Sequence, residues 1–250
     1  MQSRNRMCLV VLLAGVFTVL GLAEASQAQM IGPGFARRFP GRGGAQAAPL
    51  MKDATGIHLA RNRQVPLQPQ QLTDGGGFRW DIYQNCNIQT GTNNAYSGGL
   101  NPQINNNGFG SNGQAFASKD NDEFEIGPYN VSNVTYSRRV KVYKDAALAR
   151  WIDIFENPSN AEITVNFAVY SSFCWQVAST KYSSGKNTFG EDDWALITNV
   201  QGNPGVPSLL HIVCDKKSKV RPSIQVQGNT LWVRYTFRIP ANGSAALCYF

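Results

Sequence analysis

The feature of this chain that most constrains its fold is the alternation of apolar residues in two segments, 163–170 and 231–239. The alternating apolar residues are Ile163, Val165, Phe167 and Val169 in the first segment and Leu231, Val233, Tyr235, Phe237 and Ile239 in the second. A period of two is typical of a strand with one buried face. Shorter segments of this kind begin at Phe78 and bring the number of expected strands to about ten. They predict an all-β fold, an antiparallel β-sandwich of about ten or more strands over residues 73–250.

The stretch "KDAALARWIDIFENPSNAEITVNFAVYSSFCW", residues 144–175, allows two interpretations. The apolar residues of its first half are spaced as on one face of a helix that Pro158 would end. Against this, "ENPSN" is a polar connection of the kind that joins two strands in a hairpin, and Trp, Ile and Phe suit a pleated surface. We therefore predict a strand over 150–156 and a hairpin with the segment that follows. A helix at 146–156 would instead change the class to α+β.

The N-terminus has the order of a secretory signal peptide. Arg4 and Arg6 precede an apolar run over 9–22, and small residues suited to a signal peptidase follow directly. The run is shorter than the roughly 20 residues that span a bilayer as a helix, so a retained membrane anchor is the weaker alternative. We predict a signal peptide over 1–28, a mature chain without a transmembrane segment, and a location that is secreted, periplasmic or at the cell surface.

Residues 29–72 are rich in Gly, Pro, Ala and Gln, and we expect a disordered basic tail in which Leu59, Val65 and Leu67 could pack on the domain. The chain has 23 Lys and Arg against 16 Asp and Glu, a net charge of +7, and most of this surplus lies in the tail, whereas residues 73–250 are nearly neutral. A nucleic-acid-binding fold would concentrate basic residues on its folded part. Nucleic acid is therefore not an expected partner. The tail is interpreted as a spacer that could contact an anionic lipid or polymer.

Four cysteines remain after the predicted cleavage: Cys86, Cys174, Cys214 and Cys248. An even number in an exported chain predicts two disulfides, and four cysteines allow three pairings. We favour a Cys174–Cys214 disulfide, because these residues flank one long polar connection, which leaves Cys86–Cys248 as the second pair. Free thiols are the alternative. Zinc is disfavoured because there is no Cys-x-x-Cys pair and His211 is the only nearby histidine.

The sequence contains little that points to catalysis. Of the two histidines, His58 lies in the tail and His211 in an expected strand, where a packed core or edge residue is the ordinary role. Neither a Gly-x-Ser-x-Gly motif nor a phosphate-binding glycine loop is present. Carboxylates could still act as in glycoside hydrolysis, which needs two of them across a cleft. The candidates are Asp153, Glu156, Glu191, Asp192 and Asp193. An ion pair between Asp153 and Arg139 or Arg150 is the structural explanation for the first of them.

Two acidic clusters raise the question of calcium: "KDNDEFE" at 119–125, with Asp120, Asp122 and Glu123, and "FGEDDW" at 189–194. Calcium needs six to eight oxygen ligands from a loop that folds around the ion. Neither cluster has the spacing of such a loop. We therefore interpret both as solvent-exposed turns and predict neither a metal nor a cofactor.

A binding surface is the functional feature that the sequence supports best. On the strand at 230–239 the apolar residues occupy one face, so Trp232, Arg234 and Arg238 share the opposite face with two threonines. A tryptophan beside two arginines could stack on a sugar ring while the guanidinium groups bind hydroxyl or carboxylate groups. The alternative is that Trp232 is covered by a loop or by a cation–π contact with an arginine.

The segment "ARWIDIFENPSNAEITVNF" resembles the strand-turn-strand rhythm of many exported bacterial β-sandwich modules, in which an Asn-Pro turn joins a Trp-bearing strand to an alternating one. This resemblance implies a fold and transfers no function. Our leading hypothesis is an exported non-catalytic β-sandwich protein that binds a glycan or another envelope or extracellular component. The alternatives are a carbohydrate-active enzyme or accessory domain that works through carboxylates, and a purely structural surface protein. The sequence carries no indication of the ligand's identity or of the oligomeric state.

Overall fold

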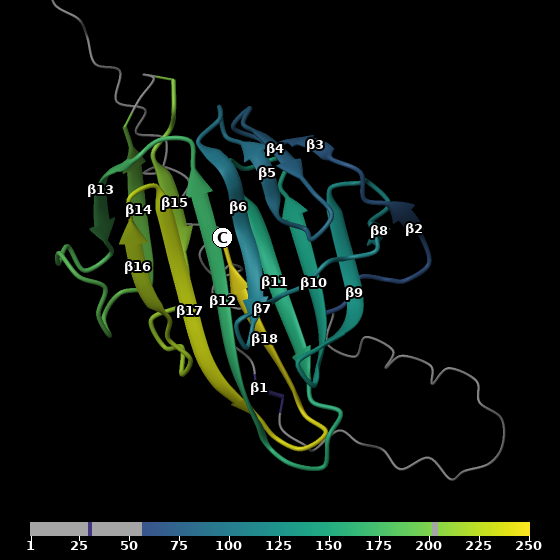
Figure 1. Ribbon diagram of the computed structural model, residues 1–250. Coiled ribbons are helices and arrows are strands. Elements are labelled where there is room, and N and C mark those ends of the chain that lie inside the picture. The colour runs from purple at the N-terminus through teal and green to yellow at the C-terminus, as the bar shows by residue number, and fades with distance from the viewer. Residues whose placement is uncertain (1–29, 32–56, 202–204) are drawn as a thin grey trace, which may run out of the picture.

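The structure is a computed structural model that describes residues 30–31, 57–201 and 205–250. The predicted signal peptide at 1–28 and most of the predicted tail lie outside these residues. Every regular element in the described part of the chain is a strand, and the strands form three antiparallel sheets (Figure 1). The prediction of an all-β antiparallel protein is therefore confirmed. Within the same residues there is no helix long and apolar enough to cross a membrane.

The first large sheet has seven strands in the order β1-β18-β11-β10-β9-β8-β2. Their bounds are Met30–Ile31 (β1), Gln64–Pro66 (β2), Gln114–Ala117 (β8), Glu123–Val131 (β9), Val134–Val142 (β10), Ala149–Glu156 (β11) and Ser244–Tyr249 (β18). The strands β9, β10 and β11 follow one another in sequence and are neighbours in space. The C-terminal strand β18 completes this sheet beside β11.

The second large sheet has eight strands: seven follow the order β16-β17-β12-β6-β5-β4-β3, and the eighth, β7, pairs with β6 off this path. Their bounds are Gln70–Thr73 (β3), Arg79–Ile82 (β4), Ile88–Gly91 (β5), Tyr96–Ile104 (β6), Asn107–Gly108 (β7), Ile163–Phe173 (β12), Ser223–Gln227 (β16) and Thr230–Ile239 (β17). The two alternating segments are the neighbours β12 and β17, in register from Ile163 opposite Ile239 to Ser172 opposite Thr230. Their alternating apolar residues are buried, except for the half-buried Ile163, and most of their polar residues face solvent, as predicted.

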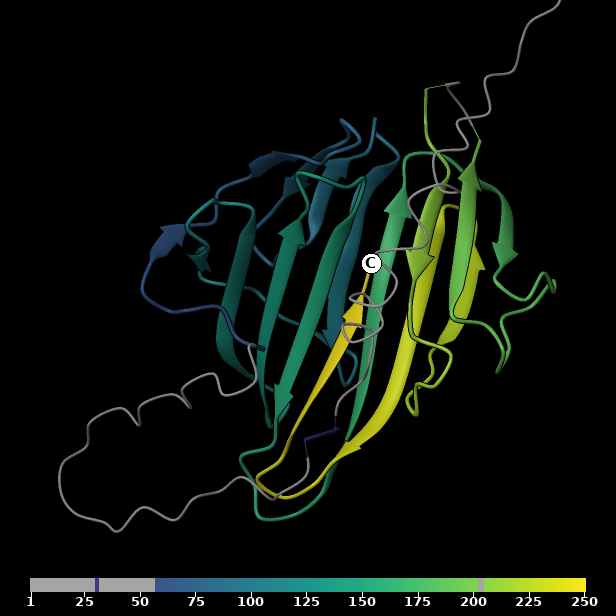
Figure 2. The ribbon, with the colours of Figure 1, turned by 180° about the vertical axis from the view of Figure 1, so that it is seen from behind.

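The third sheet is small and has the order β13 (Val177–Tyr182), β14 (Ala195–Val200) and β15 (Leu209–Ile212). Two backbone hydrogen bonds of 2.9 and 3.0 Å join Ile212 to Phe250, so β15 lies beside the end of the chain that follows β18 (Figure 2). The hydroxyl of Tyr235 in β17 donates to the carbonyl of Val213 at 2.7 Å. These bonds fasten the small sheet to both large ones.

The stretch 144–175 begins with a strand, β11, as predicted, but the predicted hairpin is wrong. β11 pairs with β10 and β18, whereas β12 pairs with β6 and β17, so the connection over 157–162 crosses from the first large sheet to the second. The amide of the buried Asn157 donates to the carbonyls of Ala161 at 2.7 Å and Pro240 at 2.9 Å. Since Pro240 lies in the connection between β17 and β18, one side chain ties together two crossings between the same sheets.

The two large sheets face each other across a core of aromatic and aliphatic side chains. Phe155 of β11 meets Phe167 of β12 and Phe237 of β17 edge-on, with ring centroids 5.0 and 5.1 Å apart. Further along β11, the ring of Trp151 lies 6.0 Å from that of Trp80 in β4. Edge-on aromatic contacts of this kind are favourable beyond the apolar area that they bury. Together, the two edge-on contacts and the tilted Trp151–Trp80 contact join one strand of the first sheet to three strands of the second.

An ion pair is buried in this core. Arg138 of β10 and Asp153 of β11 have no exposed side-chain surface, and Arg138 Nε lies 3.3 Å from Asp153 Oδ1. The hydroxyl groups of Tyr136 and Tyr249 both donate to the carboxylate of Asp153. Arg138 in turn donates to the hydroxyl of Tyr249 and to the carbonyl of Leu100 in β6, both at 2.7 Å. A charged side chain of the first sheet is therefore bonded to the backbone of the second.

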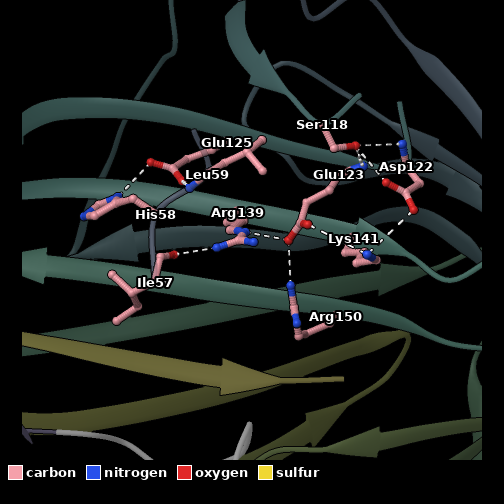
Figure 3. A network of polar contacts seen from close by, with 10 residues as sticks. All are labelled: Ile57, His58, Leu59, Ser118, Asp122, Glu123, Glu125, Arg139, Lys141 and Arg150. Carbon is pink, nitrogen blue, oxygen red and sulfur yellow. Dashed lines mark hydrogen bonds and ion pairs between the residues drawn. The ribbon is translucent and has the colours of Figure 1, made fainter. Parts of the chain in front are cut away.

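The outer face of the first sheet is crossed by residues 57–61, which charged side chains hold in place (Figure 3). Glu125 of β9 is fully buried, and its Oε1 lies 2.8 Å from Nδ1 of His58. The same carboxylate accepts the backbone N–H of Leu59. Arg139 of β10 donates to a backbone carbonyl of this segment at 2.8 Å. The segment is thus attached to β9 and β10 through buried and partly buried charges.

The folded part of the chain begins earlier than the predicted boundary between a tail at 29–72 and a domain at 73–250. Residues 57–72 contain β2 and most of β3, which pair with β8 and β4. Leu67 is 1% exposed and Val65 packs against the core, which confirms that these two residues pack on the domain. The composition of this segment predicted disorder, but its strands are held by backbone pairing at sheet edges. Backbone pairing of this kind is also possible for a Gln-rich sequence.

Removing one partner of the buried ion pair should destabilise the fold more than removing both. We expect Asp153→Asn to lower the free energy of unfolding by about 3–5 kcal/mol, because Arg138 would keep a buried charge without its counterion. The double variant Arg138→Met/Asp153→Leu should be closer to the native protein in stability. Urea unfolding of the three proteins measures the difference, and a double variant less stable than Asp153→Asn would contradict it.

Candidate functional site

The candidate site lies on the outer face of the second large sheet. The register places Trp232 of β17 opposite Gln225 of β16 on one side and Tyr170 of β12 on the other. Tyr170 in turn lies opposite Asn101 of β6. These four side chains form one row across four neighbouring strands, which Figure 1 shows side by side. All four are at least partly exposed.

The two aromatic rings of this row are stacked on each other. The ring centroids of Tyr170 and Trp232 are 4.7 Å apart, and the ring planes are inclined by 30°. Cζ of Arg234 lies 4.5 Å from the Trp232 ring centroid, and its Nη1 donates to Oε1 of Gln225 at 3.0 Å. The cation–π contact that the sequence offered as an alternative for Trp232 is thus present. It packs the guanidinium group of Arg234 against the indole, which favours one orientation of the ring.

Amide and hydroxyl groups surround the aromatic pair. The hydroxyl of Thr236 donates to Oδ1 of Asn166 at 2.9 Å, and the amide of Asn87 donates to Oδ1 of Asn101 at 2.8 Å. Further polar side chains at outward positions of the same strands are Gln103, Thr164, Ser172, Ser223 and Thr230. The face therefore combines an aromatic centre with many uncharged donors and acceptors.

In the structure Arg234 contacts Trp232, whereas Arg238 does not. Arg238 lies six residues further along β17, which corresponds to about 20 Å. Its Nη1 is 3.4 Å from Oε1 of Glu162, and both side chains are largely exposed. Sequence reasoning missed Tyr170, although its outward position in an alternating strand was readable. What it lacked was the pairing of β12 with β17, which puts Tyr170 beside Trp232.

The four cysteines of the described residues are free thiols, so neither of the predicted disulfides is present among them. Cys86 faces the core, whereas Cys248 lies beside Ile152 on the opposite face of the first sheet, so the sheet separates the two sulfurs. Cys214 is buried against the carbonyl of Asp193, and Cys174 is exposed. Burial raises the pKa of Cys86 and Cys248 to about 12 and that of Cys214 to about 11. The three buried thiols therefore remain protonated and unreactive.

The sequence suggested Arg139 or Arg150 as the partner of Asp153. In the structure Asp153 is paired with Arg138 instead. The reason is the alternation of β10 and β11, which turns Asp153 and Arg138 inward and the other two arginines outward. Burial raises the pKa of Asp153, and the Arg138 guanidinium and two tyrosine hydroxyls oppose that rise. Arg139 and Arg150 both donate to Glu123 instead (Figure 3).

The acidic clusters have protein partners. Glu123 is 5% exposed under two arginines, which corrects its interpretation as part of a solvent-exposed turn. Asp193 accepts the backbone N–H groups of Ser184 at 2.6 Å and Gly190 at 2.9 Å, and Asp192 pairs with Lys186 at 3.0 Å. The two remaining carboxylate candidates are Glu156, at the end of β11, and Glu191, in the turn before β14. Among the described residues, no group of three or more His, Cys, Asp or Glu side chains is placed to hold a metal ion.

His211 is packed in the interior, as predicted for a histidine in this strand. It is 5% exposed, and its Nε2 lies 3.0 Å from the hydroxyl oxygen of Thr198 on the neighbouring strand β14. Burial lowers the pKa of His211 to about 4. The ring is therefore neutral near pH 7 and holds two strands of the small sheet together.

Comparisons with known proteins place the chain in no family: no family model matches it, and no curated protein matches it significantly. Any proposal about function therefore starts from the residues on the outer face of the second sheet.

The buried His211 should make stability fall with acid. An unfolded chain takes up the proton near pH 6.5, whereas the native protein takes it up only near pH 4, so the unfolded state is favoured as pH falls between these values. The difference corresponds to roughly 3 kcal/mol in the free energy of unfolding at the lower end. Urea unfolding across this range should show that slope, and His211→Gln should reduce it. A slope that His211→Gln leaves unchanged would contradict the assignment of the effect to His211.

Thiol titration should distinguish free cysteines from disulfides. In a Cys8→Ser protein, we expect Cys174 to react quickly with an aromatic disulfide reagent, because it is the exposed cysteine of the described chain. All four thiols should react after unfolding without a reductant. A protein that stays unreactive in denaturant would instead contain the two disulfides.

Proposed function

We propose that this protein is an exported, non-catalytic module that binds a glycan through the outer face of the second large sheet. The observation that carries the proposal is the stacked pair Tyr170–Trp232, held by Arg234 on a face of amides and hydroxyls. Export is inferred from the order of charged, apolar and small residues over 1–28.

The chemistry of this face suits a sugar polymer. Aromatic side chains offer apolar surface for the C–H faces of sugar rings, with few rotatable bonds to order on binding. Amide groups such as those of Gln225 and Asn101 can both donate to and accept from hydroxyl groups. Arg234 adds donors that suit a hydroxyl or a carboxylate. A strongly acidic ligand is a poorer match, because the second arginine, Arg238, is paired with Glu162.

The carboxylate-based enzyme is the weaker candidate. Glycoside hydrolysis requires two carboxyl groups that face a common cleft. Asp153 lies in the core with Arg138, Asp193 accepts backbone hydrogen bonds, and Asp192 is held by Lys186. Three of the five candidate carboxylates therefore have structural partners within the protein.

Trp232→Ala and Tyr170→Ala should each weaken glycan binding about tenfold, which is the worth of one good aromatic contact. The measurement is intrinsic tryptophan fluorescence titrated with a panel of soluble polysaccharides, with isothermal calorimetry on those that shift the emission.

Two arginines of the same strand and face provide the matched control. Arg234→Ala should weaken binding, since Arg234 contacts the aromatic pair, whereas Arg238→Ala should have a smaller effect. A Trp232→Ala protein that binds every tested polysaccharide as tightly as the native protein would refute the proposal.

A further inference from the structure

The outer face of the second sheet continues beyond the aromatic pair. Ser172 and Cys174 follow Tyr170 at alternate positions, and Thr230 and Gly228 precede Trp232 in the same way. The pairing continues one step past Ser172, because the backbone N–H of Phe173 donates to the carbonyl of Asn229 at 2.8 Å. Cys174 and Gly228 are both exposed. They therefore mark one end of this outer face, beyond the aromatic pair.

A hollow of about 480 Å³ opens at this end of the strands. Its lining consists of Cys174, Trp175, Gln176, Gln201 and Asn229. Trp80, Trp151 and Trp194 pack in or against the core, and Trp232 stacks on Tyr170. Trp175 differs from them: within the described chain, its side chain has no ring contact and no hydrogen bond. A partly exposed indole beside three amide side chains repeats the chemistry of the Tyr170–Trp232 row.

The backbone around the hollow is well fixed. The carbonyl of Gln176 accepts the N–H of Gln201 at 2.7 Å, and the carbonyl of Gly228 accepts the N–H of Val177 at 3.0 Å. The amide of Asn229 donates to a carbonyl at the end of β12 at 2.9 Å. Gly228 has a φ of 61°, and a Cβ there would lie 3.2 Å from Oε1 of Gln176. Glycine at this turn thus leaves room for the Gln176 side chain beside the hollow.

We infer that a single glycan chain runs along β12 and β17 from the Tyr170–Trp232 pair into the hollow at Trp175, and that the ligand is an extended polysaccharide. This inference rests on the proposed function and adds a second contact to it. Four residues of strand separate Tyr170 from Cys174, about 13 Å. A ligand that contacts both ends must therefore be longer than one sugar residue. Ser172 and Thr230, both half-buried, lie between the two ends and offer hydroxyl groups to it.

The test is the dependence of affinity on ligand length. The probes are β-1,4-linked glucose and N-acetylglucosamine oligomers, from the dimer to the hexamer, measured by calorimetry with the whole protein. Affinity should rise about tenfold once the oligomer is long enough to reach Trp175. Trp175→Ala should abolish this rise and leave the affinity for the dimer unchanged. Gln176→Ala should reduce the rise, and Leu210→Ala, an exposed apolar residue of the small sheet, should preserve it.

The outcomes separate the two proposals. If Trp232→Ala weakens all oligomers while Trp175→Ala keeps the full rise with length, the glycan face stands and its extension to the hollow is overturned. Binding of none of the oligomers, or binding that Trp232→Ala leaves intact, overturns both. Thermal unfolding of each variant checks that the fold is retained. Should Trp175→Ala unfold, Gln176→Ala decides alone: an undiminished rise overturns the extension.

Discussion

The buried pair of Arg138 and Asp153 is the constraint on which the arrangement of the two large sheets depends. A charge inside a core is tolerated only when its partners surround it. Here the partners come from both layers: two tyrosine hydroxyls of the first sheet and the carbonyl of Leu100 in the second. Aromatic contacts alone would tolerate a small slide of one layer past the other, whereas these directional bonds would not. The pair thus selects one alignment of the layers.

The outer faces of the two large sheets differ in what covers them. On the first, residues 57–61 lie over Glu125, and the charges of β9 and β10 are neutralised by one another and by this segment. On the second, the row around Trp232 keeps exposed surface and few charges. An ordered, weakly charged and partly aromatic face is suited to an uncharged ligand rich in hydroxyl groups. This difference is why the proposed binding face lies on β12 and β17.

Several features were predictable because they depend on short stretches of sequence. The alternation of β12 and β17 was readable, and with it the outward positions of Trp232 and Arg234. The prediction of a Cys86–Cys248 disulfide was wrong for a geometric reason. Cys248 lies between two core residues of β18 and so faces away from Cys86. The prediction of a hairpin at 157–162 was wrong because a polar turn is equally suited to a connection between sheets. Asn157 stabilises this connection through a hydrogen bond to Pro240, some 80 residues away in sequence.

The sequence by itself determined that the alternating segments, such as β12 and β17, are strands and which of their side chains share a face, since the pleat of a strand is a local property of the backbone. Only the tertiary structure decided which strands are neighbours. That choice depends on contacts between residues far apart in the chain, such as Arg138 with Leu100 and Tyr170 with Trp232. The candidate site is made of such contacts, so half of its aromatic pair was visible in the sequence and the other half became visible only when β12 lay beside β17.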